Sequence, residues 1–224
     1  MTRHSTTPSA RAPHRGSVIK RLVAAVAVGG STLAVMVAPA GLVSAERAAT
    51  TSEAIARRSQ HALDSLAKWE ADRMPTDYVR YVRTRDGVAE MIAHELGLER
   101  SDVRDEFATP ALVNQHAALA ALTQLGVAYR TRASNPGVGF DCSGLTSFAY
   151  ATAGVTVPRS SGDQLRASDR VPREEAEVGD LVHYPGHVGI YLGGDIYVHS
   201  PEPGRHVEIV VMPSRSLSFG DLTL

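Results

Sequence analysis

Apolar residues recur at helical spacing in the stretch from residue 46 to residue 107. Ile55, Ala62, Leu66 and Trp69 are separated by seven, four and three positions, and charged side chains fill the gaps between them. This period predicts an amphipathic helix whose apolar stripe faces a partner surface. We expect Pro75 to end this helix, because proline breaks the hydrogen-bond pattern of a helix interior.

A second helix is predicted after Pro75, with Thr76 as its cap and Gly97 as its C-terminal stop. A short turn of helix from Ser101 to Phe107 follows. The pair Thr109-Pro110 then reads as a cap followed by proline at the first helical position, so a further helix is expected from there to Gly126.

The chain changes character beyond residue 126, where glycine and proline become frequent. One more amphipathic helix is predicted to begin at Cys142 and to end near Gly154. Short apolar runs with the period of strands follow, namely Asp180 to Tyr184, His187 to Leu192, Ile196 to His199 and Val207 to Val211. Helices precede strands, which indicates an α+β fold. We expect a helical region over residues 46–108 and a compact domain over residues 109–224.

The first 45 residues read as a targeting segment. They carry five basic and no acidic side chains, and an apolar run extends from Leu22 to Val43. This pattern predicts a secretory signal peptide, cleaved after Ala45 or after Ala40, and hence a secreted or cell-wall protein. A retained membrane anchor is the alternative, which Gly29, Gly30 and Pro39 make a poorer fit.

The net charge and the number of cysteines exclude some classes of function and structure. The 224 residues include 23 basic and 24 acidic side chains, for a net charge of -1, so no polyanion-binding field is expected and nucleic acid is not a predicted partner. A single cysteine excludes an internal disulfide. The thiol is therefore either a buried apolar group or a reactive one.

Cys142 stands where a glycine-rich loop gives way to a helix. The positive end of a helix dipole is expected to lower the pKa of a thiol there and to favour the thiolate, the nucleophilic form. A small buried apolar side chain is the alternative interpretation. The polar neighbours Asp141 and Ser143 favour the nucleophile.

Two histidines lie on neighbouring strand-like runs and supply a candidate base. His187 begins one run and His199 ends the next, with Gly193-Gly194 between the runs. A three-residue turn, Leu192 to Gly194, would place the two histidines directly opposite each other on one face, whereas a two-residue turn would put His199 on the other face. With the first geometry, His187 acts as the base for the thiol and His199 orients its ring.

The remaining histidines carry less weight. Nothing in the strand period pairs His183 or His206 with Cys142. A zinc set of Cys142, His183, His187 and His199 is disfavoured because Pro185-Gly186 breaks the helix that would bring His183 and His187 to one face. No metal or other cofactor is expected.

From about Thr109 to the C-terminus the chain resembles the NlpC-type cysteine peptidases, which cut bacterial cell-wall peptides. The matching segments, in order, are GVAYR at 126–130, FDCSGL at 140–145, VPRSS at 157–161, VGDLVHYPGHVGIYLG at 178–193 and IYVHSPEPG at 196–204. The resemblance implies a papain-like α+β core in which the cysteine-bearing helix packs on a small antiparallel sheet. It also implies hydrolysis of the bond between D-γ-glutamate and meso-diaminopimelate, or lysine, in peptidoglycan stem peptides.

Carried over residue by residue, the resemblance makes Cys142 the nucleophile, His187 the base and His199 the orienting third member. Tyr129 resembles the tyrosine that the family places beside the nucleophile. The substrate-binding residues assigned within these motifs are Tyr129, Asp141, Ser143, Arg159 and Ser160.

One departure from the family concerns the loop after Tyr129. Many members continue this tyrosine with Trp-Gly-Gly, whereas this chain has Thr131-Arg132-Ala133, which leaves the substrate preference open. A wall-binding or scaffold protein without turnover, and an amidase or acyltransferase with the same triad, are the alternative functions. The helices of residues 46–108 are expected to pack on the domain containing Cys142, where they could limit access to its cleft. The sequence identifies no partner protein.

Overall fold

The computed structural model describes residues 40–223, with side chains from residue 46 onwards. Residues 1–39, most of the predicted signal peptide, lie outside the described residues. Within the described part of the chain, no helix combines the length and apolar character needed to cross a bilayer.

Four helices precede the first strand: α1 (Ala40–Asp72), α2 (Pro75–Leu96), α3 (Arg100–Ala108) and α4 (Leu112–Leu122). Pro75 is the first residue of α2, a position whose N–H would have no partner within the helix, so the N–H that proline lacks is not missed. The N-cap residue is Met74, and the prediction that Thr76 caps this helix is wrong. Gly97 ends α2 at φ 66°, as predicted.

The predicted start of α4 at Thr109-Pro110 is wrong. The hydroxyl of Thr109 donates to the carbonyl of Asp105 at 2.8 Å and so belongs to the end of α3. Helix α4 begins two residues after Pro110, with Ala111 in the cap position.

A six-stranded antiparallel sheet follows the helices, as the α+β prediction requires. Its order is β3-β8-β4-β5-β6-β7. The strands are β3 (Asp169–Val171), β4 (Leu181–Tyr184), β5 (His187–Tyr191), β6 (Ile196–His199), β7 (Glu208–Val211) and β8 (Ser218–Asp221). The other elements are β1 (Ser134–Asn135), β2 (Gly139–Phe140), α5 (Cys142–Thr152), α6 (Ser161–Ala167) and a 3-10 turn, η1 (Arg173–Glu175).

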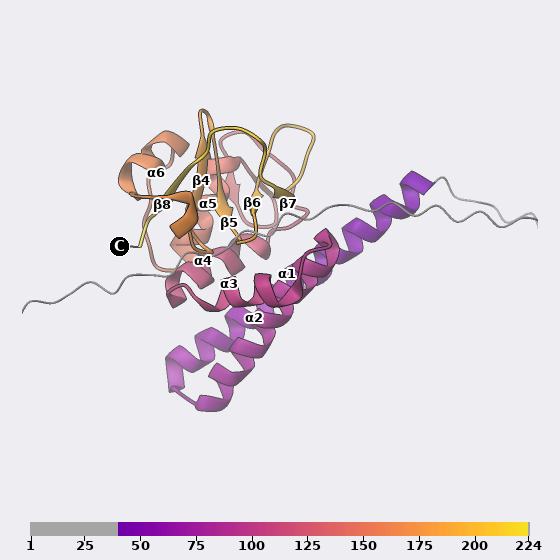
Figure 1. The fold of residues 1–224 in the computed structure, drawn as a ribbon, viewed down its shortest axis with the longest axis vertical. Coiled ribbons are helices and arrows are strands. Elements are labelled where there is room, and N and C mark those ends of the chain that lie inside the picture. Colours follow the sequence, from indigo (N-terminus) through magenta and orange to yellow (C-terminus); the bar gives the residue numbers. More distant parts are fainter. Residues whose placement is uncertain (1–39, 224) are drawn as a thin grey trace, which may run out of the picture. The chain divides into compact units, whose positions relative to one another are not determined.

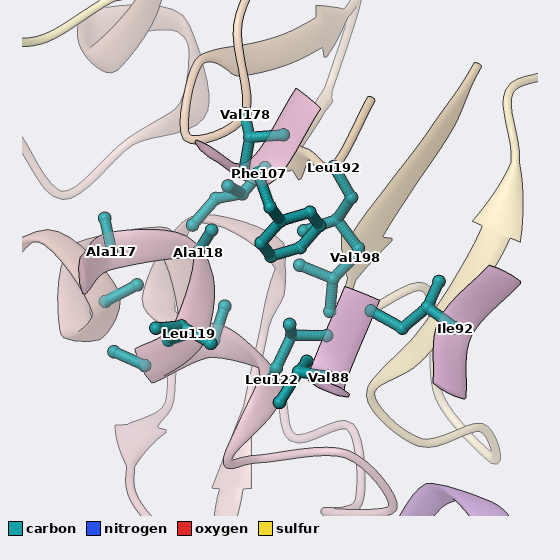
Figure 2. Packing of buried hydrophobic residues seen from close by; sticks show 14 of the residues in the cluster. Val88, Ile92, Phe107, Ala117, Ala118, Leu119, Leu122, Val178, Leu192 and Val198 are labelled. Carbon is teal, nitrogen blue, oxygen red and sulfur yellow. The ribbon is translucent and has the colours of Figure 1, made fainter. Parts of the chain in front are cut away.

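The N-terminal helices share one hydrophobic core with the sheet. Helices α3 and α4 lie between the α1–α2 hairpin and the strands (Figure 1), and Ile55 and Leu66 of α1 belong to the same buried cluster as Leu119 of α4 and Ile190 of β5. Figure 2 shows Phe107 of α3 among the side chains of this cluster. The expectation that these helices pack on the domain containing Cys142 is therefore confirmed.

The β5–β6 hairpin differs from the predicted register by two residues. Ile190 pairs with Val198, which places His199 opposite Gly189 instead of opposite His187. The turn has three residues, as predicted, but it is Gly193 to Asp195, because the N–H of Leu192 donates to the carbonyl of Ile196 at 3.0 Å. A shift of two keeps every side chain on its predicted face.

Candidate active site

Cys142 is the first residue of α5, and the neighbouring residues fix its position. Asp141 is the N-cap, and its carboxylate accepts a hydrogen bond from the N–H of Gly144 at 2.7 Å. A β-carbon on Gly144 would lie 1.9 Å from the carbonyl oxygen of Ala133, so only glycine fits there. The loop before α5 and the first turn of α5 are thereby held together around the thiol.

The thiol of Cys142 lies next to β5. The backbone at Val188, the residue after His187, and at Ser143 forms hydrogen bonds with the sulfur that favour its thiolate. Burial outweighs them and raises the pKa of the Cys142 thiol, and the nearby Asp141 carboxylate acts in the same direction. The backbone at the helix terminus acts in the predicted direction, but the prediction of a lowered pKa is wrong because desolvation is the larger influence.

His187 and His199 form a directly hydrogen-bonded pair. The two residues are 7% and 5% exposed, and Nε2 of His187 lies 2.8 Å from Nδ1 of His199. The two rings meet edge to face, with centroids 5.0 Å apart. Tyr184 stacks on His187, with ring centroids 4.8 Å apart. His187 and His199 occupy diagonal positions on neighbouring strands, and side chains at such positions are close enough to touch.

Both histidines are neutral at pH 7. Burial, with smaller influences from the charges of Arg215 and His183, lowers the pKa of His187 to about 4. Burial, followed by His187 and Arg205, lowers the pKa of His199 to about 3. With the thiol pKa raised as well, the resting site holds an uncharged thiol beside uncharged imidazoles.

Glu208 lies next to His199 and was not predicted from the sequence as a site residue. It pairs with His199 across β6 and β7, and its Oε1 lies 3.4 Å from Nε2 of His199, an atom without a hydrogen-bond partner among the described residues. Arg205 forms an ion pair with the same carboxylate. Because each neutral imidazole carries one proton, a proton on Nε2 of His199 would face this carboxylate and leave Nδ1 to accept from His187.

A cleft of about 620 Å³ opens at Cys142. It is lined by Tyr129, Arg132, Asp141, Cys142, Ser143, Arg159, Ser160, Ser161, Asp163 and Gly186. The structure thus brings the nucleophile candidate together with all five predicted substrate-binding residues, and Gly186 adjoins His187. No residue of the 46–108 region contributes to this lining.

Three of the lining residues form a hydrogen-bonded network. Arg159 donates through Nη2 to the carboxylate of Asp141 at 2.8 Å and through Nη1 to the hydroxyl of Ser143 at 2.9 Å. It also donates to the carbonyl of Ala133 at 3.3 Å. Ser160 caps α6 by accepting from the N–H of Asp163. These side chains shape the cleft wall as well as presenting polar groups to it.

The other histidines are outside this constellation. His183 lies on β4, and burial lowers its pKa, with Arg170 acting in the same direction. None of the four histidines His183, His187, His199 and His206 is among the residues that line the cleft. His183 is near enough to lower the pKa of His187, but among the described residues its Nε2 has no hydrogen-bond partner. Among the side chains that the structure describes, no three of the types that ligate metal ions come together in a suitable cluster.

Residues 126–218 match the model of the NlpC/P60 family. RipB, a peptidoglycan endopeptidase of Mycobacterium tuberculosis, is 48% identical over 83 residues, which cover 35% of this chain and 33% of RipB. A γ-D-glutamyl-L-lysine dipeptidyl-peptidase of Bacillus subtilis is 37% identical over 84 residues, covering 34% of this chain and 28% of that protein. The match spans about a third of the length of these relatives.

A solved structure is also similar. RipD of Mycobacterium tuberculosis, described as a non-catalytic NlpC/p60 domain protein adapted to peptidoglycan binding, is 29% identical, with a TM-score of 0.43 over 50% of this chain and 99% of that structure. The resemblance drawn from the sequence motifs is confirmed for residues 126–218 by the family match.

Proposed function

We propose that this chain, whose residues 126–218 belong to the NlpC/P60 family, is an exported cysteine endopeptidase that hydrolyses peptidoglycan stem peptides. The observation that carries the proposal is the arrangement around Cys142. Cys142 is the first residue of α5 and lines a polar cleft. Its sulfur forms a hydrogen bond with the backbone at Val188, beside His187, and His187 is hydrogen bonded to His199.

The raised pKa of the thiol and the lowered pKa of His187 define the first step of the proposed mechanism. Nε2 of His187 is engaged with His199, so Nδ1 is the atom that accepts the thiol proton as the sulfur attacks the scissile carbonyl carbon. The imidazolium forms only during reaction, and its Nε2–H remains directed at His199.

The start of α5 is suited to the negative oxygen that this attack creates. The first N–H groups of a helix have no partner within the helix, and the carboxylate of Asp141 accepts from Gly144, so the N–H of Cys142 is available to donate to that oxygen. The C–N bond then breaks as His187 returns its proton to the leaving amine. Water, deprotonated by His187, hydrolyses the thioester and frees the thiol.

The proposed scissile bond is the one between D-γ-glutamate and diaminopimelate. A relative at 37% identity is named for the D-γ-glutamyl-L-lysine bond, which has the same acyl group. Export through the N-terminal targeting segment would bring the enzyme to the cell wall. In this proposal residues 109–224 hold the catalytic machinery, and the 46–108 region completes their hydrophobic core.

Digestion of purified peptidoglycan by the full chain, followed by mass spectrometry of the products, tests this proposal. New termini at D-γ-glutamate and diaminopimelate are expected. Release of stem peptides from the glycan, or transfer of the acyl group to an added amine, would instead identify an amidase or an acyltransferase. Wall binding without products, and with Cys142 unreactive towards iodoacetamide, would identify a non-catalytic wall-binding protein.

A further inference from the structure

Arg132 differs from the other charged side chains that line the cleft. Arg159 is hydrogen bonded to Asp141 and Ser143, and Asp163 forms an ion pair with Arg166. Arg132 is exposed in the cleft wall, and among the described residues nothing forms an ion pair or hydrogen bond with its guanidinium. The charges of the other lining residues are therefore compensated, and Arg132 leaves one positive charge facing the cleft.

The backbone at Arg132 is in a conformation that arginine rarely adopts. Its φ is 59°, and only three non-glycine residues of the described chain have a positive φ. Arg132 occupies the third position of a tight turn in which the N–H of Ala133 donates to the carbonyl of Arg130 at 3.2 Å. Glycine is favoured at that position of such a turn.

A side chain placed at an unfavourable backbone position, inside a cleft and without a partner, fits a binding role better than a packing role. Strained residues concentrate where function requires them. Guanidinium groups bind carboxylates through two parallel hydrogen bonds, a geometry that an exposed loop arginine can offer to a ligand.

We propose that Arg132 binds a free carboxylate of the stem peptide and makes this enzyme selective for substrates in which that carboxylate is not amidated. The inference rests on the proposed function and goes beyond it, since it names the chemical group that the cleft recognises. The carboxylate belongs either to the α-carboxyl group of D-γ-glutamate or to diaminopimelate. Both flank the proposed scissile bond and both have the same chemistry.

Four synthetic stem peptides separate the two sources: one with both carboxylates free, two in which one of them is a carboxamide, and one in which both are carboxamides. The wild-type chain is expected to cleave the first peptide with a kcat/KM roughly tenfold above that of the peptide lacking the recognised carboxylate, the usual size of a hydrogen bond to a charged group. The difference should lie in KM, because the contact is made on substrate binding.

Arg132→Gly should abolish this selectivity. It is expected to lower kcat/KM for the carboxylate peptide roughly tenfold and to leave the carboxamide peptide unchanged, while Arg132→Lys retains part of the preference. The turn favours glycine, so Arg132→Gly should unfold at the same or a higher urea concentration than the wild type. Arg130→Gln is the matched control, since Arg130 belongs to the same loop and carries the same charge but does not line the cleft.

Affinity gives a second readout that does not depend on turnover. In a Cys142→Ala background, Arg132→Gly should weaken binding of the carboxylate peptide by a similar factor in calorimetry, and the effect should shrink at high salt. Equal cleavage of all four peptides by an active wild type, or an unchanged KM in Arg132→Gly, would overturn the inference and leave the proposed function standing. Cleavage of none of them would overturn the function, and the inference with it.

Discussion

Acidification should destabilise this protein through the buried His187–His199 pair. A histidine in the unfolded chain has a pKa of about 6.5. The pKa of His187 in the folded protein is about 4, because burial disfavours its charged form. Between these two values the unfolded chain binds a proton that the folded protein does not. The stabilising contribution of neutral His187 is therefore complete above pH 6.5 and is lost as the pH falls towards 4.

The size of this loss follows from the difference between the two pKa values. About 2.5 units at roughly 1.4 kcal/mol per unit gives about 3 kcal/mol between pH 7 and pH 4. His187 is only 7% exposed, so solvent screening reduces this value little. A loss of that size is a substantial fraction of the stability of a typical domain.

Urea unfolding of the full chain at a series of pH values from 7 to 4 measures this effect. His187→Gln is the matched variant, because glutamine is polar but does not titrate. Its stability relative to the wild type should rise by about 3 kcal/mol across this range, whatever the offset at pH 7. Stability curves that stay parallel from pH 7 to 4 would show that His187 does not titrate as its burial implies.

Four further substitutions probe the site. His187→Ala should lower kcat by roughly 10²–10⁴-fold, the usual contribution of a general base, and His199→Ala should lower it less; equal losses in steady-state assays would mean that the two roles are misassigned. Glu208→Gln should lower kcat several-fold and alter its pH profile, because Oε1 of Glu208 lies 3.4 Å from Nε2 of His199; an unchanged profile would remove Glu208 from the mechanism. Gly144→Ala should destabilise the fold by roughly 1–3 kcal/mol in urea unfolding, because its β-carbon would lie 1.9 Å from the carbonyl oxygen of Ala133; stability equal to wild type would contradict this steric account.

The strand period was sufficient to predict which histidines meet, but not their register. His187 and His199 share a face for any turn of odd length, and this is the part of the prediction that the structure confirms. Two consecutive glycines allow the three-residue turn to begin at either of two positions. The choice of Gly193 depends on the hydrogen bond between Leu192 and Ile196, which has no local sequence signal.

Non-local pairings and burial account for most of the differences from the sequence prediction. Strand β8 lies between β3 and β4 in the sheet although it follows both far along the chain, so its pairing has no local sequence signal. Strand β3 has only three residues, which is too short for a clear alternating pattern. The thiol pKa depends on how deeply Cys142 is buried by the packing of α5 on the sheet. Glu208 could have been predicted from the sequence, because extending the strand pairing from the β5–β6 hairpin to β7 places it opposite His199.

Cleavage of a single synthetic tripeptide, L-alanyl-γ-D-glutamyl-diaminopimelate, by the full chain and by its Cys142→Ala variant tests the central claim most directly. The account predicts that the wild type releases free diaminopimelate and that Cys142→Ala releases none while unfolding at the same urea concentration, because the substitution removes the attacking sulfur and little else. Release of diaminopimelate by Cys142→Ala at the wild-type rate would show that the thiol is not the nucleophile.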